Sequence, residues 1–369
     1  MKLLELDEKW LQPFDVADPF SGLRLEGYLS LKPDHRYGAL ALLKVDEREA
    51  PQRILATPKL RYPFDRSGAF HFPSVRKIDI YEKIDGTNIL AYRLRDAENR
   101  WHVTYKLRLS PVLRNGKWGH FLDMWKEMLD RYPQIPGLPV MNECALSFEL
   151  FGSRNALLML YETPLDCALL FGVDADGRYR SIDELDCGEV PVPAHLGCLK
   201  AGEDPVAVYG RIRERLQATI QARDDDKLSG QEGAVWYVTT TEMERVLFKC
   251  KPESVEAIHW KGGINKGAVL ATCWNMLETE DVLHYERLER LLLEEYSQAE
   301  IDAFRGHIDA CMEAVNEELR FRDRVLEAYD SVGIKLTEDK ASVMRRLSEE
   351  FPRALMKKVY TLILRYGDG

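Results

Sequence analysis

The segment Tyr81-Glu82-Lys83-Ile84-Asp85-Gly86-Thr87-Asn88 holds a lysine, an acid and a glycine in the order K-x-D-G. A lysine amine can act as a covalent nucleophile once it is neutral, and a glycine lets the backbone approach a bound group closely. Taken alone the motif is a weak indication, because it recurs by chance in about one in twenty chains of this length. Its weight therefore depends on the residues that lie further along the chain.

Four further segments come after it in a fixed order. They are Phe148-Glu149-Leu150-Phe151-Gly152, Leu169-Leu170-Phe171-Gly172-Val173, Glu232-Gly233-Ala234-Val235 and Phe248-Lys249-Cys250-Lys251. The first carries a carboxylate in an apolar strand, the second an aromatic residue at a strand end, and the third a carboxylate beside a glycine. The fourth carries two lysines that share one face of a strand, because side chains alternate along it. Together with K-x-D-G, these segments are a strong indication of a functional site.

In combination, the segments resemble the motifs of the covalent nucleotidyltransferases, meaning the polynucleotide ligases and the mRNA capping enzymes. Within that superfamily, Lys83-Ile84-Asp85-Gly86-Thr87-Asn88 and Lys249-Cys250-Lys251 are similar to the ATP-dependent RNA ligases of the phage T4 RNA ligase 2 group. DNA ligases and capping enzymes usually carry arginine where this chain has Asn88. They also have a late R-x-D-K motif, which does not occur after Lys251. The resemblance covers residues 82 to 251.

This resemblance implies an ATP-dependent RNA ligase that joins 5′-phosphate and 3′-hydroxyl ends. Lys83 would attack the α-phosphate of ATP and form a lysyl-AMP, from which AMP would pass to the 5′-phosphate of the RNA. Lys249 and Lys251, together with Mg²⁺ or Mn²⁺, would stabilise the charge that develops on the phosphate. We expect the same cations to disfavour a charged Lys83 and so to free its amine.

Further roles are implied by the resemblance at matching positions. Glu149 is expected near the ribose hydroxyls, Phe171 would stack on adenine, and Glu82 would lie near the adenine amino group. Glu232 would help to hold the metal or to orient Lys83. The family often has an acidic residue after the aromatic one, whereas this chain has Gly172, so any role of that carboxylate is absent or moved.

The K-x-D-G segment and the chain after it supply the remaining nucleotide-binding positions. Asp85 and Gly86 belong to the motif itself, and Gly86 would allow close backbone approach to the nucleotide. Asn88 would support the site through hydrogen bonds. Arg108 is similar to an arginine that the family carries between its first and third motifs, and Lys106 is the competing candidate for that role.

We expect an α+β protein of three domains. Residues 1–75 are predicted to form a β-rich, OB-like domain, because apolar residues at 23, 25, 29 and 31 have the period of a half-buried strand. Periodicity does not distinguish a barrel from a sheet. Residues 76–268 are predicted to form an ATP-grasp-like nucleotidyltransferase domain of antiparallel sheets with flanking helices, since no regular crossover helices separate its strands. Residues 269–369 are predicted to be helical.

Local signals predict several boundaries. Turns are expected near Pro33-Asp34 and Pro51, and a helix is expected from Gly119 to Tyr132. An apolar stripe at helical spacing is formed by Ile301, Phe304, Ile308, Met312, Val315 and Leu319. A last helix is expected to begin at Thr337-Glu338-Asp339-Lys340, with inward side chains Val343, Leu347, Phe351 and Leu355.

Composition limits the classes of protein to which this chain can belong. The 369 residues carry a net charge of −10, which argues against a protein that coats nucleic acid over its whole surface but allows one basic groove. The seven scattered cysteines include no C-x-x-C pair, so neither disulfides nor a zinc site is expected. No membrane segment, signal peptide or obligate protein partner is evident, and a cytoplasmic location is expected.

Two alternatives stay open beside the RNA ligase. One is another covalent nucleotidyltransferase, either a DNA ligase or a capping-type guanylyltransferase. The other is a non-catalytic RNA-binding protein on a ligase scaffold. The sequence does not choose between a nick, a hairpin break and two single-stranded ends as the substrate, and it leaves the helical domain equally suited to packing or to substrate binding.

Overall fold

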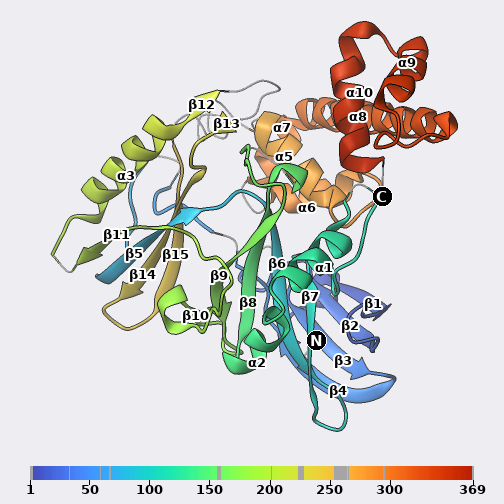
Figure 1. Ribbon diagram of the computed structural model, residues 1–369. Coiled ribbons are helices and arrows are strands. Elements are labelled where there is room, and N and C mark those ends of the chain that lie inside the picture. The colour runs from blue at the N-terminus through green and yellow to red at the C-terminus, as the bar shows by residue number, and fades with distance from the viewer. Residues whose placement is uncertain are drawn as a thin grey trace.

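The computed structural model describes residues 3–367 except 33, 59, 66–67, 118, 156–158, 201, 223–227, 253–263, 265 and 294–295. Antiparallel sheets and helices are both present, so the predicted α+β class is confirmed. Three sheets of four or five strands come first along the chain, and a group of helices follows them (Figure 1). No helix in the described part of the chain is long and apolar enough to cross a membrane.

The first of these, the N-terminal sheet, is an antiparallel meander. A 3-10 helix, η1 (Glu8–Trp10), precedes its strands β1 (Leu11–Ala17), β2 (Arg24–Ser30), β3 (Leu40–Val45) and β4 (Arg48–Ile54). Leu25 and Leu29 of β2 are buried, as the period of two predicted. Asp46 and Glu47 both have positive φ, 49° and 63°, and form the two-residue turn between β3 and β4. Such a turn matches the twist of the paired strands.

Pro51 lies inside β4, so the turn expected near it is wrong; of the other expected turn, position 33 lies outside the described residues. β4 is an edge strand, where a residue without a backbone N–H is tolerated. The pairing of β4 with β3 also shifts register between Leu42 and Lys44, close to this proline. The turn signal was therefore local, and the strand environment overrode it.

For residues 1–75 the sequence predicts a β-rich, OB-like domain and leaves barrel and sheet open, and the described strands β1 to β4 form an open sheet. In the order β1-β2-β3-β4, the first and last strands are the two edges and do not pair with each other. The buried leucines of β2 and β3 instead pack against Leu90, Tyr92 and Leu94 of a strand in the next sheet. The apolar face is thus covered by a neighbouring sheet, so the barrel does not need to close.

That neighbour, the β6 sheet, has the order β10-β9-β8-β6-β7. Its strands are β6 (Thr87–Arg95), β7 (Trp101–Lys106), β8 (Ala145–Phe151), β9 (Asp166–Val173) and β10 (Tyr179–Arg180). One face is covered by α1 (Phe121–Arg131) and by the short η2 (Ile135–Gly137) and α2 (Leu138–Met141), with Trp125 packed on Phe148 at a ring distance of 5.4 Å. The helix predicted for Gly119–Tyr132 is confirmed as α1.

The third sheet, the β5 sheet, has the order β11-β5-β14-β15. Its strands are β5 (Val75–Lys83), β11 (His195–Lys200), β14 (Gly233–Thr240) and β15 (Arg245–Cys250). The helix α3 (Pro205–Thr219) covers one face, where Trp236 is fully buried (Figure 1). The other face packs on β9 of the β6 sheet, through Tyr81 and Tyr237 against Phe171. The motif segments of the sequence thus lie on two sheets that face each other.

Short elements connect these sheets. They are η3 (Ser153–Asn155), η4 (Ile182–Glu184), and the paired β12 (Gln221–Ala222) and β13 (Leu228–Ser229). The helical region contains α5 (Lys266–Leu277), α6 (Tyr285–Leu292), α7 (Gln298–Ala303), α8 (Arg305–Val332), α9 (Lys340–Glu350), η5 (Arg353–Leu355) and α10 (Met356–Tyr366). The domain boundaries expected after residues 75 and 268 stay predictions.

Most of the predicted apolar stripe of the helical region lies on α8, whose Ile308, Val315 and Leu319 are buried. The last predicted helix corresponds to α9, where Asp339 accepts a hydrogen bond from the backbone N–H of Ser342 and caps the helix. The inward position expected for Leu355 is wrong, because this side chain is 37% exposed in η5. The helix ends before the four-residue spacing reaches it.

Candidate nucleotidyltransferase site

The site begins with Lys83, the last residue of β5. Glu232 directly precedes β14, and the pairing of Gly233 with Lys83 brings the two side chains together. The Lys83 Nζ donates to Glu232 Oε2 at 2.5 Å, and the Lys251 Nζ lies 2.6 Å from Glu232 Oε1. One carboxylate therefore bridges two ammonium groups that come from opposite ends of the motif set. The Glu232 side chain is 3% exposed, so water screens these ion pairs weakly.

Strand alternation decides which residues share this face. Lys83 lies on the same face of β5 as Tyr81, the face that packs on the β6 sheet. Lys249 pairs with Val235 and shares that face, as expected from the sequence. Its Nζ lies 4.4 Å from the centre of the Tyr62 ring.

Glu82 lies on the opposite face of β5, opposite Ala234, on the side covered by α3. Burial raises the pKa of its carboxyl, and a hydrogen bond with Gln231 opposes that effect. The side chains of Glu82 and Lys83 therefore lie on opposite faces of β5, and the position of Glu82 near the adenine amino group stays a prediction. Strand alternation sends neighbouring side chains to opposite faces, which the short motif does not reveal.

The charges around Lys83 hold it as an ammonium ion. Burial opposes its charge, but the carboxylates of Glu232, Glu149 and Asp85 outweigh burial and raise the pKa of Lys83 well above its ordinary value. Burial would likewise raise the pKa of Glu232, yet Lys251 and Lys83 lower it to about 2. That Lys249, Lys251 and a divalent metal together free the Lys83 amine stays a prediction, and the metal would have to offset the carboxylates that favour the ammonium form.

Asp85 and Gly86 make close contacts with other residues of the chain. The carboxylate of Asp85 accepts the Met159 N–H at 2.7 Å, and its own N–H donates to the Tyr161 hydroxyl at 2.8 Å. A Cβ on Gly86 would lie 2.3 Å from the Leu150 carbonyl oxygen. Both residues thus shape the backbone turn after β5, and their predicted contacts with a nucleotide stay predictions.

Asn88 and Glu149 face each other across β6 and β8. The Asn88 amide donates to Ser147 Oγ at 2.9 Å and to the Phe148 carbonyl at 3.0 Å, and reaches Glu149 Oε2 at 3.4 Å. Burial raises the pKa of Glu149 to about 8, although the charge of Lys83 opposes this. Near neutral pH this carboxyl can therefore hold a proton, and a cation that binds beside it would favour release of that proton.

Phe171 lies on β9 between the two sheets and is 3% exposed. Its ring centre lies 6.1 Å from Tyr179 and 6.4 Å from Tyr237. The Tyr237 hydroxyl donates to the neighbouring Leu170 carbonyl at 3.0 Å. Stacking of Phe171 on adenine stays a prediction, and it requires that the packed ring become accessible.

Of the two candidates Arg108 and Lys106, geometry favours the arginine. Lys106 is fully buried and donates to the carbonyls of Gly38 at 3.0 Å and of Arg108 at 2.9 Å. Burial, together with the charge of Arg108, lowers the pKa of Lys106 to about 7. The Arg108 Nε is itself buried and makes no hydrogen bond within the described residues. Lys106 thus supports the backbone beneath Arg108, and the arginine retains an unused donor.

Glu278 is a residue of this site that the sequence motifs did not indicate. It follows α5 and lies 191 positions after Thr87, whose hydroxyl reaches its Oε1 at 3.3 Å. Burial raises the pKa of Glu278 to about 7, while the Thr87 hydrogen bond and the charge of Arg108 oppose this. Nearby, Arg114 donates to the Thr279 carbonyl at 2.9 Å. The helical region therefore contacts the motif segment directly, and no spacing rule could have revealed it.

The acidic side chains can be tested against the expected divalent metal. Among the described residues, no group of three or more His, Cys, Asp or Glu is placed to hold an ion. Mg²⁺ needs fewer, because it usually binds through one or two carboxylates together with substrate phosphates and water. Glu149 and Glu232 fit this donor set, and both interact electrostatically with Lys83. Metal binding by Glu232 stays a prediction.

Comparisons with known proteins found solved structures of similar fold. No family model matches the chain, and no curated protein does. An archaeal ATP-dependent RNA ligase (form 1) is 16% identical over 92% of this chain and 84% of its own, with a TM-score of 0.47. A protein from Aquifex aeolicus described as a candidate ATP-dependent DNA ligase is 14% identical over 94% and 86%, with a TM-score of 0.43.

A Naegleria gruberi RNA ligase with ATP and Mn is 18% identical over 51% of this chain and 52% of its own, with a TM-score of 0.32. All three TM-scores lie below 0.5, so the chemistry of this chain rests on the geometry of its own site. By their descriptions these solved structures are ligases, the class that the motifs of residues 82–251 resemble, and they do not single out the phage T4 RNA ligase 2 group.

Proposed function

We propose that this protein is an ATP-dependent polynucleotide ligase that acts through a nucleotide bound covalently to Lys83. The observation that carries the proposal is the Glu232 bridge, which fixes Lys83 at 2.5 Å and Lys251 at 2.6 Å in a buried, charged site. A surface lysine needs no such arrangement, and perturbed titratable groups concentrate where chemistry occurs. Motif order and geometry thus support the same residue.

The first step forms one bond and breaks another. The neutral Nζ of Lys83 attacks the α-phosphorus of ATP, a P–N bond forms, and the bond to pyrophosphate breaks. Lys83 must first lose a proton, and the ionised form of Glu149, with a pKa near 8, is a stronger base for it than Glu232, whose pKa is about 2. Lys251 and Lys249 supply positive charge for the phosphate oxygens. A divalent metal, when bound, neutralises phosphate charge and competes with Lys83 for the carboxylates.

The later steps define the ligase. AMP passes from Lys83 to the 5′-phosphate of a strand, and a 3′-hydroxyl then displaces AMP to seal the break. We propose RNA as the strand, because Thr87-Asn88 and the lack of a late R-x-D-K motif separate this chain from DNA ligases and capping enzymes. Asn88 supports this assignment by its contact with Glu149 at 3.4 Å, where those enzymes carry a larger, charged arginine.

Labelling of the protein by nucleotide tests the proposal. The chain is incubated with Mg²⁺ or Mn²⁺ and either ATP or GTP labelled in the α-phosphate, then denatured and examined for bound label. We expect acid-labile label from ATP that is lost in Lys83→Ala. Lys77→Ala is the matched control, since Lys77 lies on the same strand, half exposed and paired with Asp79 at 2.7 Å.

Three results would contradict the proposal. Label from GTP alone would favour a guanylyltransferase. No label under any metal condition would favour a non-catalytic binding protein. A panel of nicked duplexes with RNA or DNA on each side of the break addresses the substrate, and sealing of all-DNA nicks alone would exclude RNA.

A further inference from the structure

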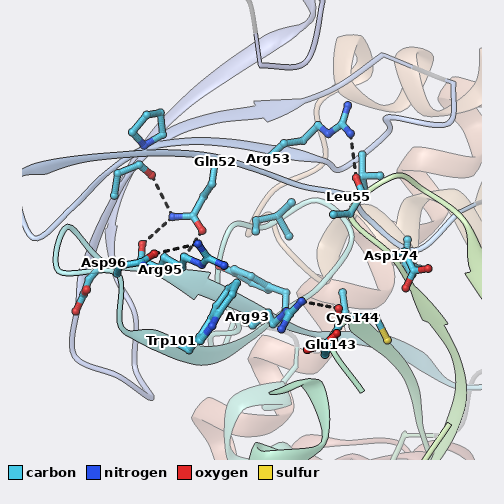
Figure 2. A pocket seen from close by; sticks show the side chains of 18 residues that line it. Gln52, Arg53, Leu55, Arg93, Arg95, Asp96, Trp101, Glu143, Cys144 and Asp174 are labelled. Atoms are coloured by element: carbon cyan, nitrogen blue, oxygen red, sulfur yellow. Dashed lines mark hydrogen bonds between the residues drawn. The ribbon is translucent and has the colours of Figure 1, made fainter. Parts of the chain in front are cut away.

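A cavity of about 420 Å³ lies between β4 and the end of β6 that is remote from the K-x-D-G segment. Figure 2 shows Arg53 and Gln52 on one wall and Arg93, Arg95 and Trp101 on the other. None of the predicted site residues lines this cavity. Arg93 lies five positions after Asn88 along β6, which corresponds to roughly 17 Å of strand.

The three arginines of this cavity carry charge that no carboxylate neutralises. Arg53 donates to the Ala175 carbonyl at 2.9 Å, Arg93 to the Glu143 carbonyl at 2.5 Å, and Arg95 to the Asn99 side-chain oxygen at 3.0 Å. All three acceptors are neutral. Within the described part of the chain, none of these guanidinium groups forms an ion pair with an acidic side chain.

Other arginines of the N-terminal sheet behave differently. Arg24 pairs with Asp15 at 2.7 Å, and Arg48 pairs with Glu98. In a protein of net charge −10, acidic partners are plentiful. Among the described residues, the three cavity arginines lack such a partner and lie around one cavity, and guanidinium groups without a carboxylate are suited to phosphate oxygens.

Trp101 adds a flat surface beside two of these charges. It lies on β7 opposite Arg95 and is 39% exposed. The guanidinium groups of Arg95 and Arg93 lie 4.1 and 4.4 Å from its ring centre. Indole and guanidinium planes both stack on nucleic-acid bases.

The walls of the cavity are held rigidly. The Gln52 amide donates to the Arg95 carbonyl at 2.7 Å and accepts the Arg95 N–H at 2.9 Å, so that it ties β4 to β6 (Figure 2). The lining also holds three acidic residues, Asp96, Glu143 and Asp174. The Asp96 carboxylate accepts from Arg100 and His102, and among the described residues neither of the other two forms an ion pair with an arginine. A preformed site loses less free energy on ordering when a ligand binds.

We propose that this cavity binds a segment of single-stranded RNA belonging to the ligase substrate, with phosphates at Arg53, Arg93 and Arg95 and a base on Trp101. The proposal rests on the ligase function proposed above and extends it to a contact remote from the reacting end. At about 3.4 Å per stacked nucleotide, the 17 Å of strand between Asn88 and Arg93 corresponds to five nucleotides or more. The contact therefore exists only for strands longer than that.

A length series of RNA tests this directly. Binding of fluorescent 5′-phosphorylated RNA of 4, 12 and 20 nucleotides is measured for the wild type, Trp101→Ala and the double variant Arg93→Ala, Arg95→Ala. We expect both variants to bind the longer RNAs about tenfold more weakly, as for the loss of one stacked base. We expect no change for the 4-nucleotide RNA. Loss of two phosphate contacts should also reduce the salt dependence of the double variant by about 1.4 in slope.

The controls separate this inference from the proposed function. Arg24→Ala, an exposed and already paired arginine of the same region, should bind RNA as the wild type does. If the double alanine variant does not fold, the double variant Arg93→Lys, Arg95→Lys is used in its place, because it keeps both positive charges. Labelling of Lys83 by ATP is measured in each variant and should be unchanged, and its failure in the wild type would sink the function while leaving the binding result interpretable.

Two outcomes overturn the inference. In the first, the cavity variants bind RNA of every length as tightly as the wild type does. In the second, poly-glutamate competes with the 20-nucleotide RNA for the wild type as strongly as unlabelled RNA does, which would assign the cavity to an acidic protein segment.

Discussion

Replacing Glu232 by glutamine removes the charge that bridges Lys83 and Lys251 while keeping the size of the side chain. Glu232 is the leading carboxylate among those that raise the pKa of Lys83. In Glu232→Gln we therefore expect the pKa of Lys83 to fall, although Glu149 and Asp85 still favour its ammonium form. The free amine should then appear at lower pH than in the wild type.

The effect on stability can be worked from the same bridge. The pKa of Glu232 falls from its ordinary 4.5 to about 2, which corresponds to about 3 kcal/mol of folding free energy. Loss of one partner of a buried ion pair costs a similar amount, roughly 3–5 kcal/mol. Because the pKa is lowered, this stability is present in full above about pH 4.5 and is lost as the pH falls through 2. Glu232→Gln should therefore be destabilised at pH 7 and lose less than the wild type on acidification.

Competitive acetylation measures the Lys83 amine without metal or nucleotide. Wild type and variant are treated with trace acetic anhydride across a range of pH, and acetyl-Lys83 is quantified by mass spectrometry against a reference amine. We expect acetylation to rise at lower pH in Glu232→Gln. Glu82→Gln is the matched control, since this carboxylate lies beside Lys83 in sequence but on the other face of β5, and it should leave the profile in place.

An unchanged pH profile of Lys83 in Glu232→Gln would refute the reasoning, because the bridge would then not govern the ammonium form. An equal shift in Glu82→Gln would refute it as well, since the effect would then come from net charge and not from the geometry of one face.

Two further predictions use buried groups near the site. Burial and the charge of Arg108 lower the pKa of Lys106 to about 7, so the folded state favours the neutral amine. The free energy of unfolding of the wild type should therefore rise between pH 7 and 10.5 by up to about 1.4 kcal/mol per pH unit. Urea unfolding of Lys106→Met should show a weaker dependence of this free energy on pH. Burial raises the pKa of Glu278 to about 7, so the contact of the helical region with Thr87 should weaken as the pH rises through 7. Hydrogen exchange at residues 114–117 should then become faster with this rise in pH in the wild type but not in Glu278→Gln. The same pH dependence of exchange in the variant would contradict the prediction.

Much of this site was predictable because its motifs describe local backbone requirements. Lys83 at a strand end, and Lys249 and Lys251 on one face, follow from the order of short segments and from alternation. The α1 and α8 helices followed from apolar spacing. These features depend on neighbours within a few residues, where the sequence pattern acts directly.

The features that the sequence could not provide depend on contacts between distant segments. The leucines of β2 have the pattern of a half-buried strand, and that pattern is the same whether a barrel closes or the β6 sheet covers it. Glu278 enters the site from a helix end 191 positions after Thr87, with no motif of its own. The charge state of Lys83 is the clearest example, because it depends on the sum of carboxylates from three separate strands and turns.

That charge state bears on how the enzyme would be regulated by its own substrates. With its pKa raised by Glu232, Glu149 and Asp85, Lys83 is held as an ammonium ion, and as the proposed nucleophile it would stay inactive until another cation competed for those carboxylates. Glu149, with a pKa near 8, is the carboxylate best able to change its proton occupancy as that happens. The same carboxylates that orient the amine would therefore prevent its reaction with stray electrophiles. Under the proposed function, activation would require a metal to bind with the nucleotide and to add its positive charge to that of Lys249 and Lys251.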